Sequence, residues 1–159
     1  MHEPMKNTVR NLAKALTLAA AVSFAALHAS AKDVALIVAK SSALKGIQSA
    51  EITKAFKTSP AKWADGKEIV FVIKAPSSNE TKILGTKLFN QTAEGLPNFL
   101  TNAKRTFIVV ATDEDVIKAV NSMPHAIGVV DLYSINGSVT VLKVDGKSPL
   151  EPGYLLHYN

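Results

Sequence analysis

The side chains with the clearest chemical potential lie in one short run, Lys74-Ala-Pro-Ser77-Ser78-Asn79-Glu80-Thr81. The run follows an apolar stretch, residues 69–73, that predicts a buried strand, and it precedes a stretch with helical spacing of apolar residues. In open α/β sheets ligands bind at the carboxyl ends of the strands. Hydroxyls, a lysine ammonium and free backbone N–H groups at a helix start could hold an oxyanion there. The predicted ligand-binding residues are Lys74, Ser77, Ser78, Asn79 and Thr81.

A purely structural interpretation of the same run is also open. Ser77 or Ser78 would then be the N-cap of the following helix, because a serine hydroxyl accepts a hydrogen bond from the free N–H groups of the first turn. Pro76 would shape the turn between the strand and the helix. The residues alone favour this interpretation over anion binding.

The other candidate residues fit no catalytic or metal-binding pattern. The chain has no cysteine, and it lacks the glycine-rich phosphate loop, the dinucleotide-binding glycines and the nucleophile elbow of hydrolases. His125 and His157 are far apart in the sequence, without the spacing of a metal site. The acidic run 113–115 suits the positive end of a helix. We therefore predict no catalytic residue, no metal site, no cofactor and no enzymatic activity; a hydrolase would need a nucleophile–base pair that the sequence does not offer.

Residues 1–31 have the pattern of a cleavable signal peptide. Lys6, Arg10 and Lys14 precede an apolar run over 15–29, and Ala29-Ser30-Ala31 provides a small-x-small cleavage site. The apolar run is shorter than the roughly 20 residues that a membrane-spanning helix needs. The sequence thus predicts cleavage after Ala31, a periplasmic or secreted protein, and no membrane insertion once the leader is removed.

Composition and charge limit the classes of partner expected for the remaining domain, residues 32–159. The formal net charge of the whole chain is +5, part of it in the leader. The lysines are scattered and not interleaved with aromatic residues, so nucleic acid is not an expected partner. Without disulfides the domain depends on its core for stability, and its length is sufficient for one such core.

The apolar pattern predicts strands that alternate with helices. Strands are expected over 34–38, 69–73, 106–110 and 126–130, with helices beginning near Ser49, Ser78, Leu96 and Thr112. Asn136-Gly137 is a hairpin signal, which predicts that 139–144 returns as the final strand. The tail 154–158 would form an edge strand or remain undocked. Such alternation indicates an α/β layered domain with some parallel pairing.

The order of several stretches resembles a known family. These are Ile52-Thr-Lys-Ala-Phe56, Trp63-Ala-Asp-Gly66, the strand and serine turn of 69–78, Pro124-His-Ala-Ile-Gly128, and 139–149. Together they resemble the phosphate-binding type of periplasmic substrate-binding proteins, in particular its short, single-lobe members. The resemblance implies an α/β fold: a single three-layer-like lobe of a type II periplasmic binding protein, with a mixed sheet and flanking helices.

The family's anion turn is only partly retained in this resemblance. Lys74 stands where the family has arginine, and Ser78 falls on the serine of its Ser-Gly-Thr turn, whereas Asn79 replaces glycine and Glu80 replaces threonine. A carboxylate at a helix start occupies the positive end that an anion would use. Two functions therefore stay open. One is binding of phosphate or another small oxyanion for an ABC transporter or sensor; the other is a cell-envelope protein-interaction module that has lost ligand binding.

Overall fold

The computed structural model describes residues 33–103 and 105–158, which belong to a single compact unit. The predicted signal peptide, 1–31, lies outside the described residues. Within the described part of the chain, no helix combines the length and apolar character needed to cross a membrane.

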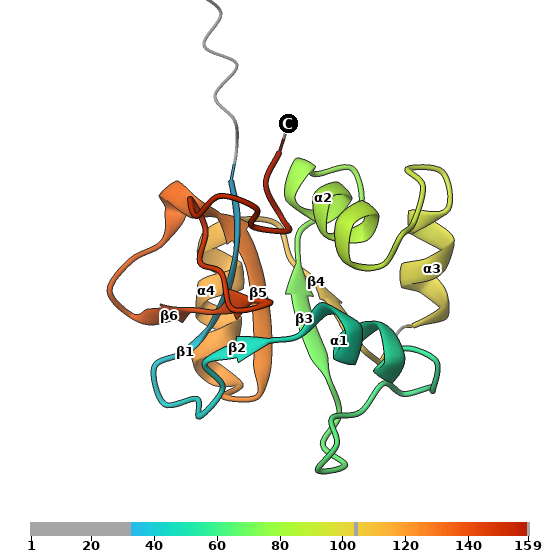
Figure 1. Ribbon diagram of the computed structural model, residues 1–159, viewed down its shortest axis with the longest axis horizontal. Helices are drawn as coiled ribbons and strands as arrows, with labels where there is room; N and C mark the ends of the chain where they lie inside the picture. The colour runs from blue at the N-terminus through green and yellow to red at the C-terminus, as the bar shows by residue number, and fades with distance from the viewer. Residues whose placement is uncertain (1–32, 104, 159) are drawn as a thin grey trace, which may run out of the picture. The chain divides into compact units, whose positions relative to one another are not determined.

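A mixed five-stranded sheet forms the centre of the domain (Figure 1). Its strands are β1 (Val34–Ala39), β3 (Val70–Ile73), β4 (Phe107–Val109), β5 (Ala126–Asp131) and β6 (Val139–Val141), in the order β4-β3-β5-β1-β6. β3 pairs in parallel with β4 and β5, whereas β1 is antiparallel to β5 and β6. The expectation of an α/β domain with some parallel pairing is confirmed.

The predicted hairpin between residues 126–130 and 139–144 is wrong. β6 pairs with β1 rather than with β5, because β1 enters between them in the sheet. The 139–144 stretch also divides into two strands. Only β6 joins the main sheet, and β7 (Lys143–Val144) instead pairs in parallel with β2 (Gly46–Ile47) in a small second sheet. The Asn-Gly signal describes a local turn correctly but cannot specify which strand the chain meets after it.

Helices cover both faces of the main sheet. α1 (Ser49–Ala55), α2 (Asn79–Leu88) and α3 (Leu96–Asn102) pack on one face, and α4 (Asp113–Ser122) packs on the other. Strand residues alternate between the two cores, as the period of a strand requires. In β1, for example, Leu36 belongs to the core under α1–α3 and Ile37 to the core under α4. All six residues of β1 are buried, which confirms the prediction of a strand covered on both faces.

The core under α1–α3 is aromatic. Its phenylalanines are Phe56, Phe71, Phe89, Phe99 and Phe107, and the ring centroids of neighbouring pairs lie 4.4–6.2 Å apart. They come from five separate segments, so the cluster ties β3 and β4 to the helices above them. Tilted and edge-on pairs of this kind add to the burial of apolar area.

The core under α4 is aliphatic and depends on a glycine. A Cβ atom on Gly128 of β5 would lie 2.7 Å from Val116 and 2.8 Å from both Ile37 and Val120. Glycine at this position lets α4 approach the sheet more closely than any side chain would allow.

The two ends of the sheet are formed by different sets of segments. The carboxyl end is defined here by the segments that follow β3, β4 and β5, namely 74–78, 110–113 and 132–134. The opposite end is formed by the loops 40–45, 62–68 and 123–125. The C-terminal tail forms neither the edge strand nor the undocked segment that the sequence suggests. It packs as coil, with Tyr154 and Leu156 buried in the core.

Candidate functional site

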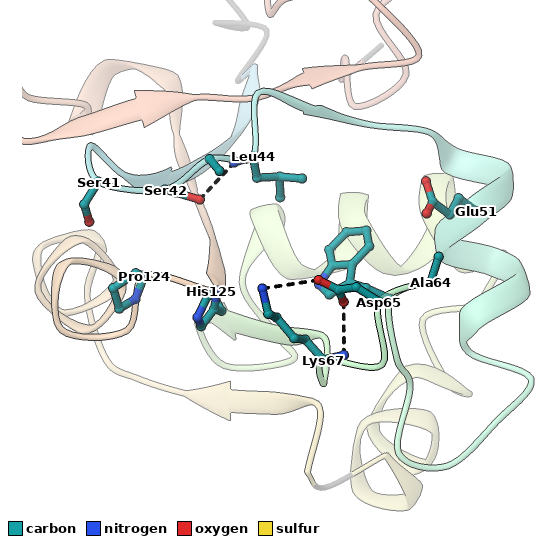
Figure 2. Close-up of a pocket in the computed structure, with 11 residues that line it drawn as sticks. Ser41, Ser42, Leu44, Glu51, Ala64, Asp65, Lys67, Pro124 and His125 are labelled. Carbon is teal, nitrogen blue, oxygen red and sulfur yellow. Dashed lines mark hydrogen bonds and ion pairs between the residues drawn. The ribbon is translucent and has the colours of Figure 1, made fainter.

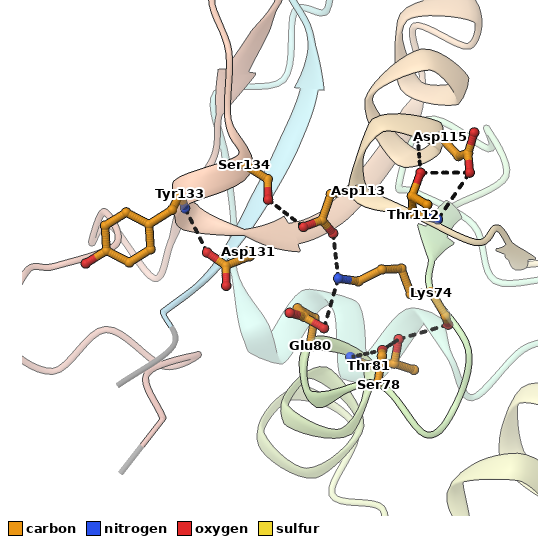
Figure 3. Close-up of polar contacts among 10 residues, drawn as sticks. All are labelled: Lys74, Ser78, Glu80, Thr81, Thr112, Asp113, Asp115, Asp131, Tyr133 and Ser134. Carbon is orange, nitrogen blue, oxygen red and sulfur yellow. Dashed lines mark hydrogen bonds and ion pairs between the residues drawn. The ribbon is translucent and has the colours of Figure 1, made fainter. Parts of the chain in front are cut away.

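An ion cluster of three side chains lies at the carboxyl end of the sheet (Figure 3). Lys74 follows β3, and its Nζ atom lies 3.1 Å from Oε2 of Glu80 and 2.7 Å from Oδ1 of Asp113. Glu80 stands in the first turn of α2, and Asp113 is the first residue of α4. Two helices on opposite faces of the sheet therefore each direct a carboxylate at one ammonium group.

The cluster is largely buried. The side chains of Lys74, Glu80 and Asp113 are 16%, 7% and 15% exposed. Burial by itself lowers the pKa of Lys74, but the hydrogen bonds and charges of Asp113 and Glu80 outweigh it, and the pKa of Lys74 is raised. Lys74 is thus held as an ammonium ion by its two partners.

A chain of hydroxyl groups fixes the start of α2 beside this cluster. Ser78 is the N-cap, and its Oγ atom accepts a hydrogen bond from the backbone N–H of Thr81 at 3.3 Å. The Ser78 hydroxyl donates to Oγ1 of Thr81 at 3.0 Å, and the Thr81 hydroxyl donates to the backbone carbonyl of Lys74 at 3.0 Å. These bonds close the turn between β3 and α2, so the prediction that Ser77 or Ser78 caps the helix is confirmed for Ser78.

Hydrogen bonds also fix the position of Asp113 at the start of α4. Thr112 and Asp115 form a capping box: the Thr112 hydroxyl accepts from the Asp115 N–H at 3.1 Å, and the Asp115 carboxylate accepts from the Thr112 N–H at 3.1 Å. The second carboxylate oxygen of Asp113 accepts a hydrogen bond from the Ser134 hydroxyl at 2.6 Å. Ser134 belongs to the short 3-10 helix η1 (Leu132–Ser134) that follows β5, so Asp113 links the ends of all three parallel strands.

The electrostatics of the site differ from those of a free anion site. Two carboxylates face one ammonium, which leaves the three side chains with a net charge of −1. Both carboxylates sit at helix N-termini, where the aligned peptide dipoles favour negative charge. They therefore occupy the positions at which an oxyanion would find its favourable partial charges.

The five predicted site residues divide into two groups. Lys74, Ser78 and Thr81 are brought together by the hydrogen bonds of the turn. Ser77 and Asn79 are exposed, and within the described residues their side chains make no hydrogen bond. The assignment of all five to an anion site remains a prediction.

Sequence reasoning missed the role of Asp113. The acidic run 113–115 was expected only to complement the helix dipole, which describes Asp115 in its capping box but not Asp113. A usable signal was present, because Asp113 follows a predicted strand just as Lys74 does. Parallel strands place such residues at one edge of the sheet.

The two histidines lie apart from the ion cluster. His157 Nδ1 pairs with the buried carboxylate of Asp33, at the start of β1. His125 is exposed in the loop before β5. Within residues 33–103 and 105–158, no group of three or more histidine, aspartate or glutamate side chains is arranged to hold a metal ion.

Comparison with solved structures finds this fold in phosphate transport proteins. An ABC-type phosphate transport receptor from Vibrio cholerae matches with a TM-score of 0.62 and 15% identity, over 80% of this chain and 54% of that one. PstS from Borrelia burgdorferi matches with a TM-score of 0.62 and 20% identity, over 80% and 55%. A putative phosphate ABC transporter substrate-binding protein from Clostridium perfringens, solved with bound phosphate, matches with a TM-score of 0.57 and 21% identity, over 72% and 46%.

These matches confirm the expected fold. The domain has the α/β architecture, with a mixed five-stranded sheet and flanking helices, of one lobe of a PstS-like protein. The chain spans about half the length of the solved proteins it matches. None of the three is described as an enzyme. No protein-family model and no curated protein sequence matches the chain.

Proposed function

We propose that this protein is a non-enzymatic binding module of the cell envelope, built as a single lobe of the substrate-binding-protein type, that acts by contacting a partner protein. The fold and the half-length match to phosphate-binding proteins support the class. The leader predicted over residues 1–31 supports export to the periplasm. The observation that carries the proposal is the internal pairing of Lys74 with Glu80 and Asp113.

The physical argument against a free anion at this site is a balance of charges. At an effective dielectric constant of 20, two unit charges 4 Å apart interact by about 4 kcal/mol. An oxyanion that reached Lys74 would gain one such attraction and meet two such repulsions, from Glu80 and Asp113. It would have to displace a carboxylate that is already hydrogen-bonded and buried. The ammonium charge of Lys74 is already compensated by Glu80 and Asp113.

Tyr133, next in the chain to the Ser134 that bonds Asp113, offers an exposed side chain that a partner protein could contact. Tyr133 in η1 is 76% exposed, although residues 126–130 of the preceding strand β5 are buried. Its backbone N–H donates to the Asp131 carboxylate at 2.8 Å, which fixes the backbone of the turn that carries the ring (Figure 3). Exposed tyrosine is a residue that protein interfaces favour.

A second candidate is the oxyanion-binding form of the same module, for an ABC transporter or a sensor. It would use Lys74, Ser77, Ser78, Asn79 and Thr81. The start of α2 beside a lysine, and the phosphate bound in the Clostridium perfringens structure, favour it. In that form Glu80 or Asp113 would turn away from Lys74 when the anion binds.

Calorimetric and thermal-shift titration with inorganic phosphate and with sulfate separates the two forms. A ligand at 100 times its dissociation constant adds about 2.7 kcal/mol to the free energy of unfolding, so binding would be visible. We expect no saturable heat and no shift at 10 mM phosphate. A saturable, stabilising response of the unmodified domain would overturn the interaction form in favour of the oxyanion form.

A gain-of-function variant makes the test sharper. Glu80→Thr restores the residue type found in the family's turn and removes one of the two carboxylates that face Lys74. If Glu80 blocks the site, this variant acquires phosphate binding while Glu114→Gln, which removes an exposed carboxylate from the first turn of α4, does not. If neither variant binds phosphate, the turn holds no anion even when Lys74 is paired with Asp113 alone.

The partner itself is tested by site-specific photocrosslinking in cells. A benzoylphenylalanine is placed at position 133, with position 118 on the exposed side of α4 as the matched control. We expect a crosslinked product of defined mass from position 133 alone. No product, or the same products from both positions, would contradict a partner at the carboxyl end.

A further inference from the structure

A pocket of about 510 Å³ opens at the opposite end of the sheet (Figure 2), and none of its lining residues belongs to the ion cluster. It is formed where four segments meet: the loop after β1, the first turn of α1, the turn 63–67 and the loop before β5. Its volume lies within the range of roughly 300–1,000 Å³ typical of small-molecule sites. Neither the anion-turn prediction nor the proposed function uses any residue of this pocket.

The apolar part of the pocket is built around Trp63. This side chain is half-buried and packs against the core under α1–α3, as does Leu44 from the loop after β1. The backbone N–H of Gly66 donates to the carbonyl of Trp63 at 2.9 Å, and Gly66 has a φ of +84°. A tight turn therefore fixes the backbone that carries the indole, and the half-buried Trp63 is one of the residues that line the pocket.

The charged part of the pocket carries one uncompensated carboxylate. Asp65 and Lys67 neutralise each other, with Oδ2 and Nζ 3.2 Å apart, and the Lys67 N–H also donates to Asp65 at 3.1 Å. Glu51 extends from α1 on one side of the pocket, with His125 on the other side (Figure 2). Within the described residues the Glu51 carboxylate has no ion pair or hydrogen bond. With His125 counted as neutral, the pocket has a net charge of −1.

We propose that this pocket binds a small organic cation with an aromatic or similarly flat apolar body. The ammonium group would be attracted by Glu51 and by the face of the Trp63 ring, since indole is the best side chain for cation–π contacts. The apolar body would cover Leu44 and the remainder of the indole. An anionic ligand of the same shape would be repelled by Glu51, and a neutral one would keep only the apolar contacts.

Phenethylammonium is a suitable probe, with 2-phenylethanol and phenylacetate as neutral and anionic analogues of the same size. Trp63 is the single tryptophan of the chain, so its fluorescence reports on this pocket alone, and calorimetry supplies an independent measure. We expect saturable binding of phenethylammonium in the millimolar range or tighter. The neutral analogue should bind about tenfold more weakly, which corresponds to about 1.4 kcal/mol, and phenylacetate more weakly still.

A pair of variants assigns the effect to Glu51. Glu51→Gln keeps the shape of the side chain and removes its charge, so it should reduce the affinity for phenethylammonium about tenfold, to that of 2-phenylethanol. Glu94→Gln, in the loop between α2 and α3, removes an exposed carboxylate outside the pocket and should leave binding unchanged. Matching melting temperatures would show that both variants fold.

Three results would overturn the proposal: no saturable response of Trp63 or of the calorimeter up to 10 mM probe, phenylacetate binding as well as phenethylammonium, or Glu51→Gln binding as well as the unmodified protein. Because the pocket shares no residue with the ion cluster and Trp63 fluorescence reports on the pocket, these results leave the phosphate titration of the ion cluster unaffected. Failure here and failure of the proposed function are therefore distinguishable.

Discussion

The charged side chains are buried at one end of the central sheet and exposed to solvent at the other. At the carboxyl end, Lys74 is enclosed by Glu80 and Asp113, and the three side chains are 7–16% exposed. At the opposite end, Asp65 and Lys67 also form an ion pair, but their side chains are 55% and 58% exposed. The distances in the two clusters are similar. What differs is how much water surrounds each pair.

This difference decides what each end can contribute. A solvent-exposed ion pair adds little to stability, because water and salt screen it and because ordering two long side chains costs entropy. A buried charge that loses its partner is strongly destabilising. The buried cluster at the carboxyl end therefore holds β3, α2 and α4 together, whereas the exposed pair of Asp65 and Lys67 contributes little to the stability of the opposite end. In open α/β sheets ligands bind at the carboxyl ends of the strands, whereas the pocket carboxylate that has no ion pair among the described residues, Glu51, lies at the opposite end.

The largest effect expected from this contrast is the loss of Lys74. Lys74→Met keeps an unbranched side chain, one heavy atom shorter, but leaves the carboxylates of Glu80 and Asp113 facing each other without a cation. We expect the free energy of unfolding to fall by about 2–3 kcal/mol, at or just below the range for fully buried pairs because Lys74 keeps some exposure. Urea denaturation followed by far-ultraviolet circular dichroism measures it.

Lys67→Met is the matched control at the opposite end. It removes the same charge from a pair of similar geometry, and we expect no measurable change in the urea midpoint because that pair is exposed. Equal losses in the two variants would show that burial does not distinguish the two ends. A stabilised Lys74→Met protein would mean that the buried cluster costs more than it contributes.

Alkaline pH should produce part of the loss in the free energy of unfolding that is expected for Lys74→Met. The pKa of Lys74 is raised in the folded protein, so its contribution is fully present below the unfolded value of about 10.5 and is lost as the pH rises through the folded value. Burial also raises the pKa of Tyr154, which acts in the same direction. The informative quantity is therefore the difference between the unmodified protein and Lys74→Met, both of which retain Tyr154. That difference should shrink above pH 10.5; a constant difference would contradict the assignment.

Much of the architecture was predictable because it depends on local sequence patterns, namely apolar runs and helix-capping residues. The apolar run of β1 is hydrophobic at every position, which indicates burial on both faces, and the structure confirms it. Ser78 and Thr112 stand directly before helical apolar spacing and do cap α2 and α4. The pairing of β6 with β1 was not predictable, since a turn signal fixes the local bend but not the strand that is met after it.

The candidate site was only half predictable for a related reason. Lys74, Ser78 and Thr81 lie within eight positions of each other, so their meeting at one turn follows from the local sequence. Asp113 follows a predicted strand, which places it at the same edge of the sheet as Lys74, but the contacts of Asp113 and Ser134 depend on the register of β3, β4 and β5, which no short pattern encodes. The pocket around Trp63 has the same character, because its four walls come from segments far apart in the chain.

The smallest difference in stability is expected between variants that remove one serine hydroxyl from each end of the sheet. Ser78 caps a ten-residue helix and also bonds to Thr81, so Ser78→Ala should lower the free energy of unfolding by about 1 kcal/mol. Ser42 at the opposite end accepts one hydrogen bond, from the half-buried N–H of Leu44 at 3.2 Å. Ser42→Ala should cost about 0.5 kcal/mol, the lower end for one hydrogen bond, because water can reach the released N–H. Urea denaturation of the two variants side by side measures the order. A larger loss for Ser42→Ala would mean that the loop lining the pocket is a structural element in its own right, and that its side chains are less free to meet a ligand than their exposure indicates.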